Sequence, residues 1–545
     1  MNVQHIIDLF NSKKAVQDGY WINLWRQARS YCYPNERDDR VEGSESGVEL
    51  FETVGVDSRY RLASGMYAWM APPEQKWFEL RCSDRDLSEN DAVKTYFSTV
   101  SRIIGEYLAN SNWPSVLIQT LNELACGLDG IIYCEDTSDD TVLNFKCCRV
   151  ENVCYCEDRN GKVDTVFIEE TFTARQLVAS FKASGLTEKI LSDAADPRKC
   201  ETAYRILHVV MPRNQRDPKL ADNKNMPFAD YYIELDSKTI IHESGFYEMP
   251  FAVCRFSKVP GESYGRGPGI DKLPDLKLIN RYSEADIIGT EHLADPSYLV
   301  PDGTLVSGNF DRDPGAVIFY RPDMNGLKPE VLPNHYNPAL VQQRINELRE
   351  RIKLGFFLDI FDPLGELRNI TATEAEIRNE SKLVPFAPIA GNLHNELFRV
   401  IIQRVYAILQ RRNLLPEVPP QLFEHGEYTI EFVSKIAKAI QKIQVISWMQ
   451  TEGAIANIIP VNPEAADNFN FDKIVRDIAL INGAKVEWMR SEEEVAALRE
   501  QRSAAQQQQA AADTMLQSAG ALGANLAKAP EPGSVMESLL GGATA

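Results

Sequence analysis

A serine between two glycines is the residue of this sequence that most suggests chemistry. The stretch from Gly261 to Gly265 spells G-x-S-x-G around Ser263. Serine hydrolases use this pattern to expose a nucleophilic hydroxyl on a sharp turn between a strand and a helix. The apolar run 251–256 before it is strand-like and a helical pattern follows it, so catalysis at Ser263 is one hypothesis for this chain.

The surroundings of the motif argue against a hydrolase. Gly267, Pro268 and Gly269 delay the helix that should follow the nucleophile at once, and no H-G-G-G-like donor segment lies upstream. Residues 130–256 have the pattern of antiparallel hairpins, where a hydrolase would have β-α-β units. The candidate bases would be His335, His394 and His425. With seven histidines in the chain, their presence does not discriminate. We therefore predict no catalytic residue and no enzyme activity.

Other motifs with chemistry are missing. The sequence has no G-x-x-x-x-G-K-[ST] segment for nucleotide phosphates, and His242-Glu243 lacks the second histidine of a zinc protease. Four of the ten cysteines cluster in strand-like sequence, but no C-x-x-C occurs, so buried free thiols are expected in place of zinc ligands. These four are Cys147, Cys148, Cys154 and Cys156. We expect no cofactor and no metal.

Composition limits the partners. The chain has 545 residues, a formal net charge of -20 and a pI near 5.0, so it lacks the basic footprint of a protein that grips DNA phosphates. No apolar run approaches the ~18 residues of a membrane span, and Met1–Asp8 does not resemble a signal peptide. Many cysteines without a disulfide pattern indicate assembly in a reducing cytoplasm.

The elements expected around the glycine cluster are helices, then strands, then two long helices. Helical spacing occupies much of the first 127 residues, and short strands follow from 130 onward, with a hairpin turn at Asn160-Gly161. Asp271–Leu293 and a second helix beginning at Asn337-Pro338 flank the Pro-, Gly- and Asp-rich segment 296–336. On the second helix, Glu347 and Arg351 are spaced to pair. The chain is therefore predicted to be α+β and mainly helical.

Five local patterns, in this order, resemble the portal (head-to-tail connector) proteins of short-tailed, podovirus-type bacteriophages. They are Leu62–Met66 with Pro72-Pro73 and Trp77–Leu80; Gly261–Arg266; Leu273–Leu276 with Asn280; Thr371–Glu374; and Leu415-Pro416 followed by Tyr428–Lys438. Together they cover roughly residues 20–440. Each pattern alone is weak, but five in the right order make the resemblance specific.

The resemblance implies a structural protein that forms a ring, usually of twelve subunits, at one capsid vertex. Double-stranded DNA would pass through its channel during packaging and ejection, sliding without sequence preference. The implied partners are other copies of the chain, the terminase motor, scaffolding and major capsid proteins, and tail adaptor proteins. The implied location is the virion, after assembly in the host cytoplasm.

The resemblance also implies a portal-type division of the chain into wing, stem, clip and crown. The regions are 1–265 wing, 266–295 first stem helix, 296–336 clip, 337–355 second stem helix, 356–370 tunnel loop, 371–435 long kinked helix and wing strand, 436–500 crown, and 501–545 an Ala- and Gln-rich C-terminal segment. Within it, the candidate residues facing DNA are Lys353, Phe357, Phe361 and Arg368. Both phenylalanines are expected on a projecting loop, and the alternative is that they belong to the core. Candidate structural residues of the family motifs are Gly261, Tyr264, Gly265, Arg266, Thr371, Thr373 and Glu374.

Overall fold

The chain divides into two compact units, Met1–Ile443 and Gln444–Ala545. The computed structural model describes residues 3–34, 49–72, 75–88, 90–137, 142–217, 219–220, 222–299, 330–332, 336–361, 384–422, 428–433, 470–481, 489–490 and 494–506. In the second unit, an ion pair joins helix α17 (Phe471–Ile481) to residues 494–506. Each carboxylate oxygen of Asp472 lies 2.6 Å from a guanidinium nitrogen of Arg499. The first unit carries the glycine cluster and both long helices, so the rest of this section concerns it.

Helices dominate the N-terminal part, as the sequence predicts. The helices are α1 (Val3–Val16), a π-helical turn (Gln17–Trp21), α2 (Ile22–Cys32), α3 (Val54–Met70), α4 (Arg85–Ser88), α5 (Asp91–Asn110) and α6 (Trp113–Cys126). Trp25, Leu62 and Met66 are fully buried where α2 and α3 meet the core. Gly127 ends α6 with a φ of 100°, the left-handed conformation that glycine adopts at helix ends without strain.

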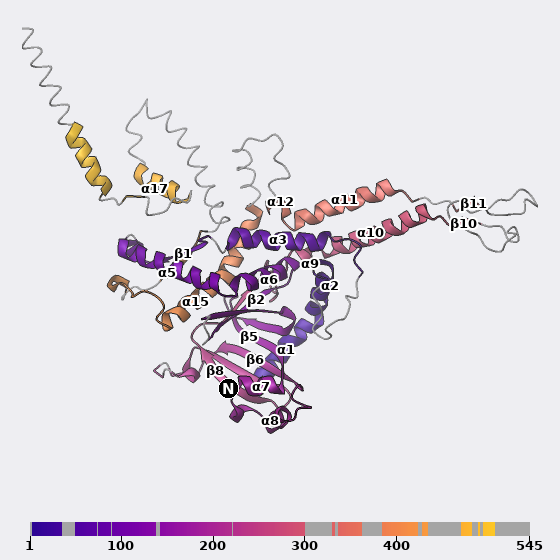
Figure 1. Ribbon diagram of the computed structural model, residues 1–545, viewed down its shortest axis with the longest axis horizontal. Coiled ribbons are helices and arrows are strands. Elements are labelled where there is room, and N and C mark those ends of the chain that lie inside the picture. Colours follow the sequence, from indigo (N-terminus) through magenta and orange to yellow (C-terminus); the bar gives the residue numbers. More distant parts are fainter. Residues whose placement is uncertain are drawn as a thin grey trace, which may run out of the picture. The chain divides into compact units, whose positions relative to one another are not determined.

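Two antiparallel sheets follow the helices (Figure 1). The larger has the order β4-β5-β6-β7-β8, from β4 (Val153–Glu157), β5 (Val163–Thr173), β6 (Ala203–Pro212), β7 (Phe228–Glu234) and β8 (Thr239–Phe246). The smaller joins β3 (Leu143–Cys148), β2 (Gly130–Asp136) and β9 (Phe251–Cys254). The predicted hairpin at Asn160-Gly161 is confirmed, with Gly161 at a φ of 77° between β4 and β5.

Two helices between β5 and β6, α7 (Ala174–Ser180) and α8 (Glu188–Ala195), were not predicted from the sequence. Thr173 caps α7 in a reciprocal capping box with Gln176. Both helices are short, and each fully buries a single large apolar side chain, Leu177 in α7 and Ile190 in α8. Such short elements give little helical periodicity to detect.

Strand β1 (Phe78–Cys82) pairs with β12 (Tyr428–Phe432), about 350 residues later in the chain. The pairing is antiparallel, with Phe78 opposite Phe432 and Leu80 opposite Ile430. Strand β1 overlaps the Trp77–Leu80 pattern of the sequence analysis, and β12 is the first part of the Tyr428–Lys438 pattern. Two distant patterns therefore form one local structure.

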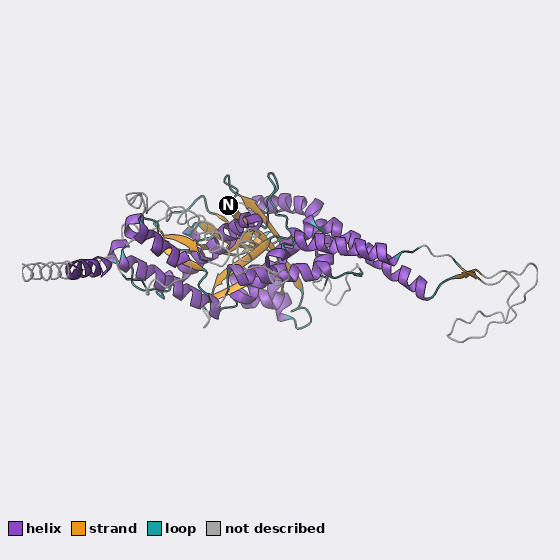
Figure 2. Cartoon of the chain, turned by 90° about the horizontal axis from the view of Figure 1, so that it is seen from above, coloured by secondary structure: helices purple, strands orange, loops and turns teal. Residues whose placement is uncertain are grey.

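The two long helices are α10 (Leu273–Ala294) and α11 (Pro338–Gly355), with the single turn α9 (Pro268–Asp271) before α10. They lie side by side and extend away from the strands in both views (Figures 1 and 2). Short strands β10 (Tyr298–Leu299) and β11 (Glu330–Val331) pair beyond their far ends. Asn337 caps α11 by accepting from the Leu340 amide at 3.3 Å, and Pro338 occupies its first turn, which confirms the predicted start.

After the short helix α12 (Leu358–Phe361), a helical run covers residues 384–411. It comprises a 3-10 turn (Val384–Phe386), α14 (Ala387–Asn392), a π-helical turn (Leu393–Phe398) and α15 (Arg399–Arg411). Pro385 lies in the 3-10 turn and Pro388 in the first turn of α14, where proline is tolerated. Among the helices described, none is both long and apolar enough to cross a membrane.

Candidate functional site

The loop between β9 and α9 is a buried junction. The backbone of Ser257 bridges Arg266 in antiparallel fashion and closes the loop at its base. The amide of Gly265 donates to Asp129 Oδ1 at 2.9 Å, and the Tyr155 hydroxyl donates to Asp129 Oδ2 at 2.7 Å. Asp129 follows the C-terminus of α6 and is 1% exposed, so it ties the loop to both α6 and β4.

Gly265 is required by close packing. A Cβ at this position would lie 2.6 Å from Asp129 Oδ1 and 2.8 Å from Arg255 Cβ, closer than such atoms approach. No positive φ is involved at Gly265; that conformation occurs at Gly261, at 89°, where a side chain would meet open space. The two motif glycines therefore serve different purposes, one for packing and one for the turn.

Arg255 is the ionic centre of the junction. Its guanidinium is 2% exposed and pairs with Glu157 on β4 and with Glu396 on the π-helical turn. Its backbone amide also donates to Glu396 Oε2 at 2.9 Å. Lys258 adds two contacts to Glu157, at 2.5 and 2.7 Å. Because buried charges are costly unless paired, this set of contacts fixes β4, β9 and the 384–411 helical run to one another.

Burial dominates the ionisation of Asp129. Desolvation raises the pKa of its carboxyl to about 7, against the lowering effect of the bonds from Tyr155 and Gly265 and of the nearby Arg255 charge. The carboxyl can therefore take up a proton near neutral pH, as a catalytic acid or base would. A catalytic carboxyl must also be accessible to substrate, and Asp129 is not. It is fully enclosed by protein, which favours a structural role.

Tyr264 and Arg266 anchor the loop to the first helices. The Tyr264 ring packs at 5.0 Å from Trp25 and at 4.9 Å from Tyr155, both edge to face. The Arg266 guanidinium lies 5.1 Å from the centre of the Trp21 ring and pairs with Glu262. The structure therefore brings Gly261, Tyr264, Gly265 and Arg266 together in one packed unit.

Ser263 contributes its backbone to this junction. Its carbonyl accepts from the Tyr155 hydroxyl at 3.0 Å and from Arg255 at 3.2 Å, whereas its hydroxyl has no partner among the described residues. Of the candidate bases, His394 stacks flat on Phe432 at 4.1 Å, and His335 and His425 lie outside the described residues. The described residues do not form the nucleophile and base pair that a serine hydrolase requires.

The helix pair α10–α11 is held by apolar and polar contacts. Ile345, Leu348 and Ile352 of α11 are buried in the same core as Leu276 and Ile279 of α10. Arg351 does not pair with Glu347 as predicted. It reaches the largely buried Asp275 of α10, with Nε at 3.3 Å from Oδ2, while Glu347 pairs with Arg344 at 2.9 Å. Spacing along one helix could not reveal a partner on another helix.

Toward the far ends, α10 and α11 contact each other through fewer groups. The Tyr336 hydroxyl donates to Asp286, and Gln342 Nε2 donates to the same carboxylate at 2.5 Å. Gly289 provides room for the Tyr336 ring, because a Cβ there would lie 2.7 Å from it. The close approach of Tyr336, which precedes α11, to helix α10 therefore depends on Gly289.

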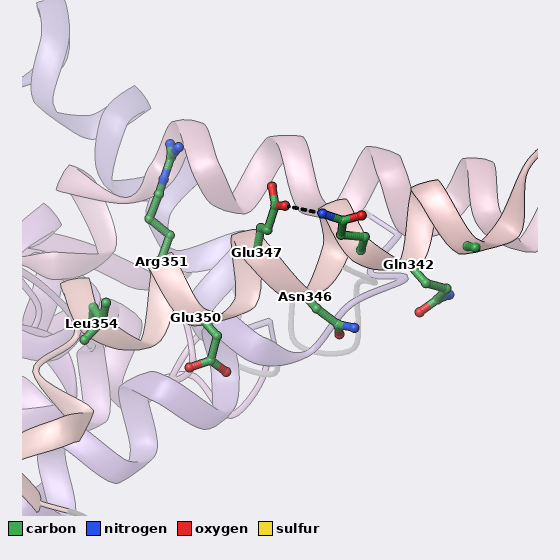
Figure 3. A pocket seen from close by; sticks show the side chains of 8 residues that line it. Gln342, Asn346, Glu347, Glu350, Arg351 and Leu354 are labelled. Atoms are coloured by element: carbon green, nitrogen blue, oxygen red, sulfur yellow. Dashed lines mark hydrogen bonds between the residues drawn. The ribbon is translucent and has the colours of Figure 1, made fainter.

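One face of α11 is open and carries both polar side chains and the exposed Leu354 (Figure 3). Glu347 and Arg351 project on one side of the helix, and Asn346 and Glu350 on the other. Gln343 donates to Glu347 at 3.0 Å, and Lys353 pairs with Glu350 at 2.8 Å. Lys353, a candidate DNA contact, is thus a solvated cation already paired along its own helix.

The two candidate phenylalanines pack inward, contrary to the expectation of a projecting loop. The Phe361 ring contacts Trp69 at 5.7 Å and Phe386 at 5.7 Å, and Gly65 leaves space for it. Phe357 lies 5.8 Å from Phe386 and 6.2 Å from Phe256, and its neighbour Phe356 is fully buried. The expectation that both rings lie on a projecting loop is therefore wrong. The Pro and Gly residues that follow in the sequence favour a loop, but the aromatic rings pack inward, in part against α3. Arg368, Thr371, Thr373 and Glu374 lie outside the described residues.

The sequence analysis missed Asp129, Arg255 and Glu396, the residues at the centre of the junction. Each of these residues bonds to a partner far away in the sequence. Asp129 and Gly265 are 136 residues apart, and Arg255 and Glu396 are 141 residues apart. A usable signal was present, because Arg255 interrupts the otherwise apolar run 251–256, and a charge in such a run requires a partner.

Other polar groups in the described part of the chain do not suggest a metal centre. No cluster of three or more His, Cys, Asp or Glu side chains there is arranged to hold an ion. Cys148 and Cys154 are buried, and Cys147 and Cys156 are partly buried, all as free thiols.

Comparison with known proteins identifies the family. Residues 5–489 match the bacteriophage head to tail connecting protein family, and the chain belongs to it. It is 27% identical over 490 residues to the probable portal protein of Bordetella phage BPP-1, covering 88% of this chain and 87% of that protein. It is 26% identical over 511 residues to the portal protein of Salmonella phage epsilon15, covering 91% and 90%. The prediction of a phage portal protein is confirmed.

Among solved structures, the chain resembles one described as the neck of an empty GTA particle computed with C6 symmetry. The TM-score is 0.36 at 11% identity, over 73% of this chain and 86% of that one. A likeness this low does not by itself establish a common fold.

Proposed function

We propose that the chain forms a ring at one capsid vertex, and that double-stranded DNA passes through a channel lined by α10 and α11 during packaging and ejection. The ring also provides the docking surface for the terminase motor and later for tail adaptor proteins, and contacts scaffolding and major capsid proteins during assembly. Membership of the connecting protein family supports this function. The protein acts as a structural conduit and needs no cofactor.

The exposed apolar residues of the helix pair are the observation that carries the proposal. Large hydrophobic side chains remain exposed along both helices, up to 60% at Leu354. They are Leu278, Tyr282, Ile287, Ile288 and Leu293 on α10, and Leu340 and Leu354 on α11. Exposed apolar side chains gathered on one feature mark an interaction surface, and repeated copies of one chain bury such a surface in a ring.

The proposed regions follow the resemblance. The wing is 1–265, the stem helices are 266–295 and 337–355, the clip is 296–336 and the tunnel loop is 356–370, of which residues 362–370 remain the candidate for contact with DNA. The stretch 371–435 contributes the long helix and wing strand, 436–500 the crown and 501–545 the C-terminal segment. Because Phe361 packs against Phe386, the proposal assigns DNA contact to the part of the tunnel loop after Phe361.

Light scattering coupled to size exclusion tests the ring. We expect a mass near twelve times 61.4 kDa for the parent protein. Ile288→Asp places a charge on the exposed face of α10 and should yield folded, smaller species, whereas Val178→Asp, at an exposed apolar position of α7, should leave the ring intact. A parent protein that stays monomeric at every salt concentration contradicts the proposal. So does a ring that Ile288→Asp and Leu278→Asp both leave unchanged.

A further inference from the structure

Arg59, on helix α3, is a buried cation that has no carboxylate partner among the described residues. Four arginines in the described part of the chain are buried, with 2–6% of each exposed: Arg29, Arg59, Arg255 and Arg404. Each of the other three pairs with at least one glutamate, as Arg255 does in the junction described above. Because a buried charge is costly unless an opposite charge compensates it, we expect an anion beside Arg59.

The contacts of Arg59 leave one edge of its guanidinium group unused. Nη1 donates to Asn122 Oδ1 of α6 at 2.5 Å, and the central carbon of the group lies 4.0 Å from the centre of the Tyr33 ring, just after α2. Nε is enclosed by protein and has no acceptor. Nη2 also lacks an acceptor among the described residues, but it is not enclosed, so an anion can approach it from solvent.

The unused edge, Nε with Nη2, is the edge that binds carboxylates elsewhere in this chain. In Arg266, these two nitrogens donate to the two oxygens of Glu262, at 2.9 and 2.8 Å. In Arg205, they donate to Glu169, at 2.9 and 2.7 Å. The two donors form a planar fork whose geometry matches the oxygens of a carboxylate or a phosphate group.

We propose that the Nε–Nη2 edge of Arg59 is a binding site for one oxyanion, a carboxylate or a phosphate group. The Tyr33 ring supports the guanidinium group and Asn122 fixes its orientation, so the fork is already held in place before the anion binds. Arg59 itself connects α3 to α6, and α3 also contacts α11 and α12. A bound oxyanion would therefore stabilise the part of the subunit from which the helix pair extends.

The oxyanion has two sources with the same chemistry. One is a free anion such as inorganic phosphate. The other is an Asp or Glu side chain of another copy of the chain, a source that rests on the proposed ring. The sequence supplies such groups in excess, with 78 Asp and Glu residues against 58 Lys and Arg residues.

Thermal unfolding in sodium phosphate, compared with sodium chloride at the same pH and ionic strength, tests the site. Phosphate should raise the thermal midpoint by about 1–3 °C wherever the fork is empty, and the rise should saturate, because a ligand that binds the folded state stabilises it. Arg59→Gln should abolish the rise. Arg59→Lys keeps the charge without the fork and should lose most of it. Arg205→Gln is the control and should keep the rise, because Glu169 already occupies that fork.

The Ile288→Asp protein, expected to form smaller species than the ring, separates the two sources. A free anion raises the midpoint of the parent and of Ile288→Asp alike. A carboxylate from another copy already fills the fork in the ring, so phosphate then raises the midpoint only in Ile288→Asp. Arg59→Gln is added to whichever protein shows the rise.

Two results would overturn the proposal: no phosphate-dependent rise in either the parent or the Ile288→Asp protein, or a rise that Arg59→Gln and Arg59→Lys both retain in full. Each midpoint is compared with that of the same protein in chloride, so a loss of stability from the substitution itself does not affect the result. If no ring forms, the phosphate response still reports on Arg59, so failure of this site is distinct from failure of the proposed function.

Discussion

At the scale of single residues, the glycine motif should respond to substitution in a way that only a structural junction explains. Gly265→Ala should destabilise the protein by about 1–3 kcal/mol, because the new Cβ would overlap Asp129 and Arg255. Ser263→Ala should change stability by less than ~0.5 kcal/mol, since only the Ser263 carbonyl is bonded. Thermal unfolding and a packaging complementation assay measure both. Loss of packaging in well-folded Ser263→Ala protein would restore the hydrolase hypothesis.

Asp129 should make stability depend on pH in an unusual direction. Its pKa is raised from 3.8 to about 7 in the folded protein, so between these values the folded state holds a proton that the unfolded state has lost. The free energy of unfolding should therefore fall as pH rises from about 4 to 7, by on the order of 2–4 kcal/mol from this group. Asp129→Asn keeps an acceptor for Gly265 and should remove that slope.

Thermal midpoints of parent and Asp129→Asn proteins, compared at several pH values, check this contribution. Asp8→Asn, at an exposed position of α1, serves as the control and should follow the parent. A difference between parent and Asp129→Asn that does not change with pH would show that the carboxyl keeps one protonation state throughout.

At the scale of elements, substitutions in the segment after α11 should show that one part of it is needed for folding and another part is not. Phe361→Ala should cost about 1–3 kcal/mol and weaken the fold, because the partly buried ring packs between Trp69 and Phe386. Replacing residues 363–369 with a short Gly-Ser linker should spare the fold and the ring while reducing DNA retention. Circular dichroism and negative-stain images distinguish these outcomes. Unfolded linker protein would show that these residues belong to the core.

Sequence patterns predicted the elements much better than their mutual contacts. The start of α11 at Asn337-Pro338 and the hairpin at Asn160-Gly161 were predictable because each depends on local backbone preferences. The pairing of Arg351 with Asp275 was not, since 76 residues separate them and the local alternative at Glu347 looked equally good. The same reason hid Asp129, Arg255 and Glu396. Phe357 and Phe361 were misplaced because nearby Pro and Gly residues indicate a loop but say nothing of what aromatic rings contact.

At the scale of the whole molecule, the net charge of -20 predicts the affinity and the sequence preference with which the protein binds DNA. Binding of a double-stranded oligonucleotide at physiological salt should be weak and independent of sequence, because few cations are available to displace counterions. Lys353→Gln should change it little, since Lys353 is already paired with Glu350. Fluorescence anisotropy over a salt series measures this. A tight complex with one preferred sequence would contradict a conduit that lets DNA slide.

The pairing of β1 with β12 has a consequence for synthesis. A ribosome releases Phe78–Cys82 long before it adds Tyr428–Phe432, and the earlier strand has no partner in the β1–β12 pair until then. Trp77 and Phe78, both buried in the finished subunit, must meanwhile be shielded in some other way, by a chaperone or by transient collapse. The β1–β12 pair can therefore form only when about four-fifths of the chain has been made. A chain cut short before β12 lacks the partner of β1, so unfinished chains leave the edge of that strand unpaired.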